Sequence, residues 1–161
     1  MLKQTVLCAT LIGLAGAVVH AQSVISAHSG LIHYSEGRVL IGDREIDMKP
    51  SVFDEVKESQ VLRTEEGRVE VLLTPGVFLR LNENSSFKMV SNKLSDTQVE
   101  ALTGTVMIEC AELLPDNSIT LIYKDRKIAI EKSGLFRLEM DSGLFRVYSG
   151  EAVVQDRKSV V

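Results

Sequence analysis

The chain has 161 residues, of which 18 are lysine or arginine and 22 are aspartate or glutamate, so its formal net charge is −4. The charges are interspersed and form no basic stripe, which argues against nucleic acid and anionic membrane surfaces as partners. A chain of this length can bury a core as one domain, so it needs neither a disulfide framework nor a metal to hold it together.

The first 21 residues are typical of a cleaved export signal. Lys3 is their only charged residue, and the stretch from Val6 to Val19 is apolar. Val19 and Ala21 stand at the minus-three and minus-one positions of a cleavage site, so we expect cleavage after Ala21. An uncleaved membrane anchor is the alternative, but the apolar stretch is shorter than the roughly 18 to 20 residues that span a bilayer. Export predicts a periplasmic or otherwise extracytoplasmic protein, which touches a membrane only if the signal is retained.

A short unit recurs in the rest of the chain: a glycine, then alternating apolar and polar residues. Alternation with a period of two predicts β-strands with one face buried and the other in water. Near the end the unit becomes a tandem copy, Ser-Gly-Leu-Phe-Arg at 133–137 and again at 142–146, which places Phe136 and Phe145 in the core. The other units start at Gly37, Gly67, Gly76 and Gly104.

The first part of this region is the least regular. Residues 22–30 form a lead-in, Leu31 and Ile32 can pair as an edge strand, and 38–41 is the first clear strand. Apolar residues at three- and four-residue spacing within 52–58 predict one or two helical turns.

Strands then follow in quick succession. Turns are expected at 65–67, at the Thr-Pro-Gly sequence 74–76, at 82–86 and at 124–126. Between these turns the alternation points Arg80 outward and one apolar set inward. That inward set includes Val69, Val71, Val77 and Leu79.

Short strands separated by turn signals every 8–12 residues or so are typical of an all-β domain. We therefore expect a single all-β domain of many short strands over residues 31–155, followed by a C-terminal tail at 156–161. The glycine-led units keep no fixed period, which favours an irregular two-sheet stack over a regular β-solenoid. A closed barrel is a further alternative.

No grouping of residues in the sequence predicts a reaction. His28 and His33 are expected to be exposed in a lead-in, without a third metal ligand. Cys110, the one cysteine left after cleavage, is expected to be a structural residue on the same strand face as Ile108. The acidic residues within 43–47 lack the glycine of a calcium loop and predict a solvated strand face. We therefore expect no enzyme activity, no metal and no cofactor.

An apolar patch is the remaining candidate site. Leu72, Leu135 and Leu144 alternate out of phase with the buried set, and Tyr148 is the aromatic residue most expected at the surface. An exposed patch of this kind would mark a surface for a partner. The alternative is a second sheet that covers this face.

Four segments, 36–39, 62–81, 102–106 and 148–153, carry a resemblance to a known family. The most specific is 62–81, Leu-Arg-Thr-Glu-Glu-Gly-Arg-Val-Glu-Val-Leu-Leu-Thr-Pro-Gly-Val-Phe-Leu-Arg-Leu. Together the segments resemble the FecR domain over about residues 31–155.

The resemblance to the FecR domain implies an extracytoplasmic all-β domain of bacteria, without catalytic residues. In the best-known relatives this domain is the periplasmic part of a transmembrane regulator that relays iron–siderophore uptake to a cytoplasmic sigma factor. Only Met1 and Leu2 precede Lys3, so a sigma-binding segment and direct anti-sigma activity are not expected here.

Two hypotheses of function follow. The first is a non-enzymatic extracytoplasmic FecR-like module that binds protein or cell-envelope components, with signalling as one role. The alternative is a structural or self-assembling cell-envelope protein, because open strand edges favour self-association.

Overall fold

The computed structural model describes residues 28–47 and 53–156, and within these it contains strands but no helix. The expected all-β fold of many short strands is confirmed. The first six strands are β1 (Leu31–Ile41), β2 (Arg44–Glu45), β3 (Val61–Thr74), β4 (Val77–Leu81), β5 (Ser86–Lys93) and β6 (Asp96–Thr103). The others are β7 (Thr105–Cys110), β8 (Ile119–Tyr123), β9 (Arg126–Ile130), β10 (Gly134–Glu139), β11 (Leu144–Ser149) and β12 (Ala152–Asp156).

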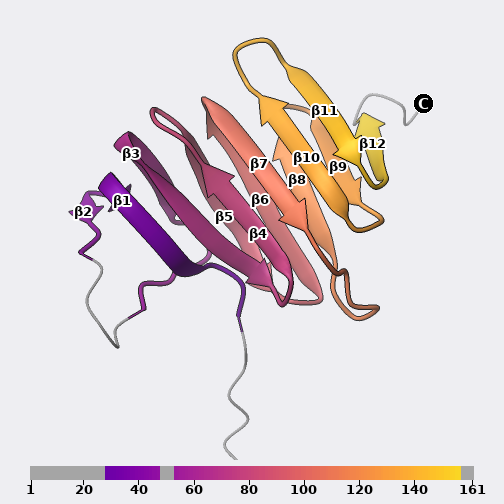
Figure 1. Ribbon diagram of the computed structural model, residues 1–161, viewed down its shortest axis with the longest axis horizontal. Coiled ribbons are helices and arrows are strands. Elements are labelled where there is room, and N and C mark those ends of the chain that lie inside the picture. Colours follow the sequence, from indigo (N-terminus) through magenta and orange to yellow (C-terminus); the bar gives the residue numbers. More distant parts are fainter. Residues whose placement is uncertain (1–27, 48–52, 157–161) are drawn as a thin grey trace, which may run out of the picture.

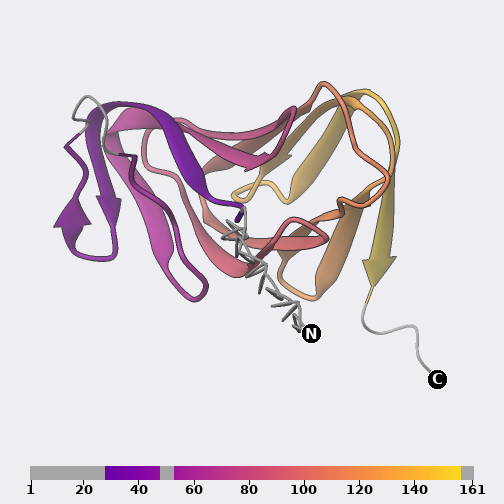
Figure 2. The same cartoon turned by 90° about the horizontal axis from the view of Figure 1, so that it is seen from below.

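All the strands belong to one hydrogen-bonded sheet, which folds over on itself into two layers (Figure 1, Figure 2). Its order is β11-β10-β7-β4-β3-β5-β6-β8-β9-β12, with β1 alongside β3 and β2 at the end of β1. The long strand β3 belongs to both layers, because its first residues pair with β5 and its later residues pair with β4. The result is a nearly closed, barrel-like sheet in which the last strands, β11 and β12, do not pair with each other.

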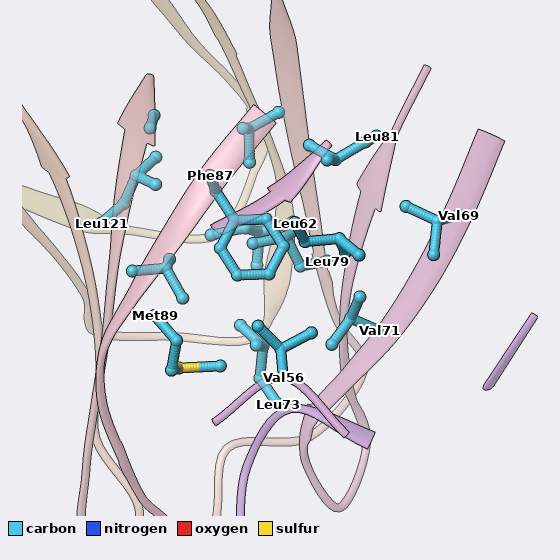
Figure 3. Packing of buried hydrophobic residues seen from close by; sticks show 14 of the residues in the cluster. Val56, Leu62, Val69, Val71, Leu73, Leu79, Leu81, Phe87, Met89 and Leu121 are labelled. Atoms are coloured by element: carbon cyan, nitrogen blue, oxygen red, sulfur yellow. The ribbon is translucent and has the colours of Figure 1, made fainter. Parts of the chain in front are cut away.

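The core lies between the two layers, where the alternation directs the apolar side chains. The predicted inward residues Val69, Val71, Val77 and Leu79 are at most 2% exposed, which confirms the pattern. Phe87 and Met89 of β5 are fully buried in the same cluster and come from the other layer (Figure 3). Burial of this set is the main source of stability, at about 1.5–3 kcal/mol for each large apolar side chain.

The turn expected at 65–67 is wrong, because β3 continues through these residues. Gly67 instead lies opposite Gly37 of β1. The two backbones approach so closely that an ideal Cβ on Gly37 would lie 2.1 Å from the carbonyl oxygen of Glu66. Gly37 also has a φ of 70°, which a residue with a side chain adopts only with strain. This glycine pair lies where β3 leaves one layer and enters the other.

The helical turns expected at 52–58 are wrong for the described residues 53–58, which contain no helix. These residues run instead along the outer edge of β1. The backbone N–H of Ile32 donates to the carbonyl oxygen of Asp54, and that of Val56 donates to Gly30, both at 2.8 Å. Backbone groups at a strand edge require partners, and a helix would have used its own donors internally. The backbone hydrogen bonds to β1 therefore decide the conformation of this segment, in spite of the helical spacing of its apolar residues.

The predicted export signal, its cleavage site and most of the lead-in lie outside the described residues, as does the tail after Asp156. Within the described part, no helix is long and apolar enough to cross a membrane.

Replacement of Gly37 by alanine tests the contact between β1 and β3, with Gly42→Ala as a matched control. Gly42 also has a positive φ, 60°, but an ideal Cβ there meets nothing within 4 Å. Both variants carry a left-handed strain of about 1–2 kcal/mol. Only Gly37→Ala also forces the strands apart, so we expect it to lower the free energy of unfolding in urea by about 3 kcal/mol or more. Equal losses in the two variants would contradict the role of the close approach.

Candidate functional site

The four residues of the predicted apolar patch lie in different settings. Leu72 on β3 and Leu135 on β10 are half-buried on the outer face of one layer, with Phe78 of β4 and Glu109 of β7 in the row between them. Leu144 and Tyr148 lie on β11 and are 41% and 53% exposed. No second sheet of the described residues covers this outer face. Leu144 pairs with Glu139 of β10 and shares this outer face, so the residues differ mainly in exposure, and the more exposed pair is on β11.

Leu144 and Tyr148 belong to a larger apolar feature at one end of the molecule. There β11 and β12 are the strands at which the sheet stops, and neither has a second strand neighbour in the described part of the chain. These two short strands carry five of the ten large hydrophobic side chains exposed among the described residues: Leu144, Val147, Tyr148, Val153 and Val154. We call the free edges of β11 and β12 (Figure 1), together with these five side chains, the open end.

Two of these residues are exposed because their strands have no neighbouring strand on one side, and not because the apolar alternation of the sequence changes. Val147 pairs with Phe136 of β10, and Val154 pairs with Ile128 of β9. Directly opposite residues of a strand pair share one face of the sheet, so both valines lie on the inner face with their partners. Phe136 and Ile128 are 1% and 3% exposed, whereas Val147 and Val154 are 45% and 52% exposed. The core is therefore incomplete at the open end.

The open end is held in place by the turn between its two strands. The backbone N–H groups of Glu131 and Lys132 donate to the carbonyl oxygen of Glu151, at 2.9 and 3.2 Å, and Lys132 Nζ lies 2.6 Å from the carboxylate of Glu151. On β11, the half-buried ring of Phe145 stacks on the buried ring of Phe136, with centroids 6.3 Å apart. These contacts fix the positions of the two free edges.

A chain of ion pairs crosses the outer face of the layer that contains β4. His33 Nδ1 lies 2.7 Å from Glu70 Oε1, Arg80 Nε lies 2.6 Å from the other Glu70 oxygen, and Arg80 also pairs with Glu109. His33 is exposed as expected, but it belongs to strand β1 rather than to a lead-in. Burial raises the pKa of Glu70, but hydrogen bonds from Arg80 and His33 outweigh it and leave the pKa below its ordinary value. These contacts join neighbouring strands and support the sheet.

Cys110 lies in a position that is typical of a structural residue. Cys110 lies on β7 on the same inward face as Ile108, and it is 2% exposed. Burial raises the pKa of the Cys110 thiol, so it stays protonated and weakly nucleophilic at neutral pH. Across residues 28–47 and 53–156, no three histidine, cysteine or acidic side chains are grouped so that they could hold a metal ion.

No protein-family model, no curated protein and no solved structure matches this chain.

Sequence reasoning missed Val147, Val153 and Val154 as members of the candidate site. Val147 and Val154 occupy inner-face positions, as the buried valines of β3 do, so their own pattern carries no sign of exposure. Val153, next to Val154, faces the other way and pairs with Ala129. The available signal was their place in the last strands of the fold, where a neighbour can be absent on one side.

Neutralising Glu70 tests the ion-pair chain through its pH dependence. A depressed carboxyl pKa stabilises the folded state above the unfolded pKa of about 4.3, and this contribution is lost as the pH falls through the folded pKa. We expect Glu70→Gln to lower the free energy of unfolding at pH 7 by about 1 kcal/mol or less, because the pair is partly exposed. The difference from the unmodified protein should shrink below about pH 4.

Glu100→Gln on β6 is the matched control for Glu70→Gln, since the Glu100 side chain forms no ion pair or hydrogen bond with the described residues. Urea unfolding of both variants across this pH range makes the comparison. A loss in Glu70→Gln that is independent of pH would contradict an electrostatic role.

Proposed function

We propose that the protein is a non-enzymatic, extracytoplasmic FecR-like module that binds protein through its open end. The observation that carries the proposal is the concentration of exposed apolar side chains on β11 and β12, the two strands with unpaired edges. An unpaired edge offers a row of backbone donors and acceptors to an added strand, and apolar side chains beside it supply affinity.

Two features of the sequence support the extracytoplasmic part of the proposal. Residues 1–21 have the composition of an export signal, and residues 31–155 resemble a FecR domain. An all-β fold agrees with that resemblance. In the best-known relatives the domain relays iron–siderophore uptake to a cytoplasmic sigma factor, and a protein-binding role here requires no catalytic residues.

A structural, self-assembling envelope protein is the second candidate, and the same open edges favour it. Growth into a long polymer, however, requires two ends that can each accept a strand. Here the two free edges, β11 and β12, lie together at one end of the molecule, whereas at the opposite end residues 54–56 lie along the outer edge of β1. A binding module therefore fits the geometry better than a polymer subunit.

Export is tested by expressing the whole chain in a Gram-negative bacterium. The mature protein is expected in the periplasm, and its intact mass should be that of a chain that starts at Gln22. Leu11→Arg places a charge in the apolar stretch and should keep the protein in the cytoplasm. Gln4→Arg adds the same charge to the basic start of the signal, where it is tolerated, and should leave export unchanged. Equal export of both variants would contradict a signal peptide.

Protein binding is tested with the exported protein immobilised as bait for a bacterial envelope extract. Lysine on an edge strand opposes strand addition, so Leu144→Lys and Val154→Lys should each lower retention of bound protein at least tenfold. Leu102→Lys and Val90→Lys are matched controls, since these residues are each 39% exposed but lie on β6 and β5. Retention that is equal in all four variants, or that never saturates, would contradict binding through the open end.

A further inference from the structure

At the end of the molecule opposite the open end lie β1 and β2 (Figure 2), and the outer edge of β1 is largely covered. Residues 54–56 cover the start of β1, and β2 covers its other end, where Leu40 pairs with Glu45. The side chains of Arg44 and Asp54 link the two covering segments at 2.7 Å. A partner strand therefore finds little free edge there.

The part of β1 between these covering segments is guarded by charge and by shape. Glu36 accepts hydrogen bonds from Tyr34 at 2.6 Å and from Arg68 at 2.8 Å, and Arg38 lies 2.6 Å from Glu65. Two register shifts in the pairing of β1 with β3 interrupt the regular ladder. Charged side chains and bulges are common devices against edge-to-edge association. Head-to-tail growth is thus blocked on the β1 side.

The open end lacks this protection and is nearly neutral. Among the residues of β11 and β12 only Arg146 and Asp156 are charged, with opposite signs. Arg146 also lies 2.8 Å from Glu139 of its own chain. The whole protein carries a net charge of −4, so two copies repel each other weakly through their overall charge. The open end therefore offers a second copy a surface with little charge.

Symmetry favours a second copy over a free peptide strand at this end. One added peptide can pair with one of the two free edges. A two-fold axis through the open end brings both edges of one copy against both edges of the other, so a single contact pairs all four. The two strands suit such pairing, because β11 has six residues and β12 has five.

The expected size of such a contact is modest. The five exposed side chains offer roughly 400 Å² per copy, so with flanking backbone the contact would bury about 1,000 Å² in total. This is the lower end of the range for specific interfaces, and we expect a dissociation constant on the order of 10 µM.

We propose that two copies of the protein form a closed, two-fold symmetric dimer through β11 and β12, so that each copy continues the sheet of the other. This inference rests on the proposed function, because it names the protein that the open end binds. The dimer covers Val147 and Val154, the inner-face residues that lack a neighbour in one copy. The described residues offer no further free edge of this kind, so association is expected to stop at two copies.

The test is sedimentation of the exported protein from about 1 to 300 µM, together with amide hydrogen exchange at both ends of this range. We expect the mass to rise from one copy to two, and amides of β11 and β12 to exchange at least tenfold more slowly in the concentrated sample. Val154→Lys and Leu144→Lys should raise the dissociation constant at least tenfold. Val90→Lys and Leu102→Lys should leave it unchanged, and urea unfolding of each variant checks that it is folded.

The outcomes separate this inference from the proposed function. Assemblies of more than two copies would overturn the closed dimer. A dimer whose dissociation constant is unaffected by Leu144→Lys and Val154→Lys would overturn it too. A protein that remains single at all concentrations, but retains an envelope protein through the open end, overturns the dimer and leaves the proposed function standing. A single copy that retains nothing overturns both.

Discussion

The close approach of Gly37 and Gly67 is the contact on which the rest of the structure depends. A side chain at either position would collide with the backbone of the opposite strand. Because both are glycine, β3 can pass from one layer to the other and keep its pairing with β1. Leu79 of β4 and Phe87 of β5 then belong to one cluster, although they lie in different layers. The fold is thus one continuous sheet rather than two separate sheets.

A sheet folded in this way has two unlike ends. At the fold, β3 joins the layers and β1 runs beside it, with covering segments on its outer edge. At the other end the chain crosses between layers twice, from β9 to β10 and from β11 to β12, and each layer finishes with a strand that has one neighbour. The open end therefore follows from the topology, and the exposure of Val147 and Val154 is its consequence.

Local sequence patterns were enough to predict most features that a single strand or turn determines, such as which side chains point inward. Alternation identified the inward side chains of β3 and β4, and Pro75-Gly76 marked a turn in which Gly76 has a φ of 79°. Contacts between distant segments could not be predicted. Glu65-Glu66-Gly67 has the composition of a turn, but its conformation is set by Gly37, which lies far away in the sequence. The parallel pairing of β6 with β8 likewise arises because β7 lies in the other layer.

The tandem copies of Ser-Gly-Leu-Phe-Arg show why the candidate site was only partly predictable. Phe136 and Phe145 occupy the same place in the two copies and stack on each other, yet Phe136 is 1% exposed and Phe145 is only partly buried. The first copy forms β10, between β7 and β11, whereas the second forms β11, which has β10 alone as its neighbour. A repeated sequence specifies which face is apolar, and topology decides whether that face is covered. The strand at the end of such a sheet therefore has the composition of a strand with two neighbours, and this makes it suited to pair with one more strand.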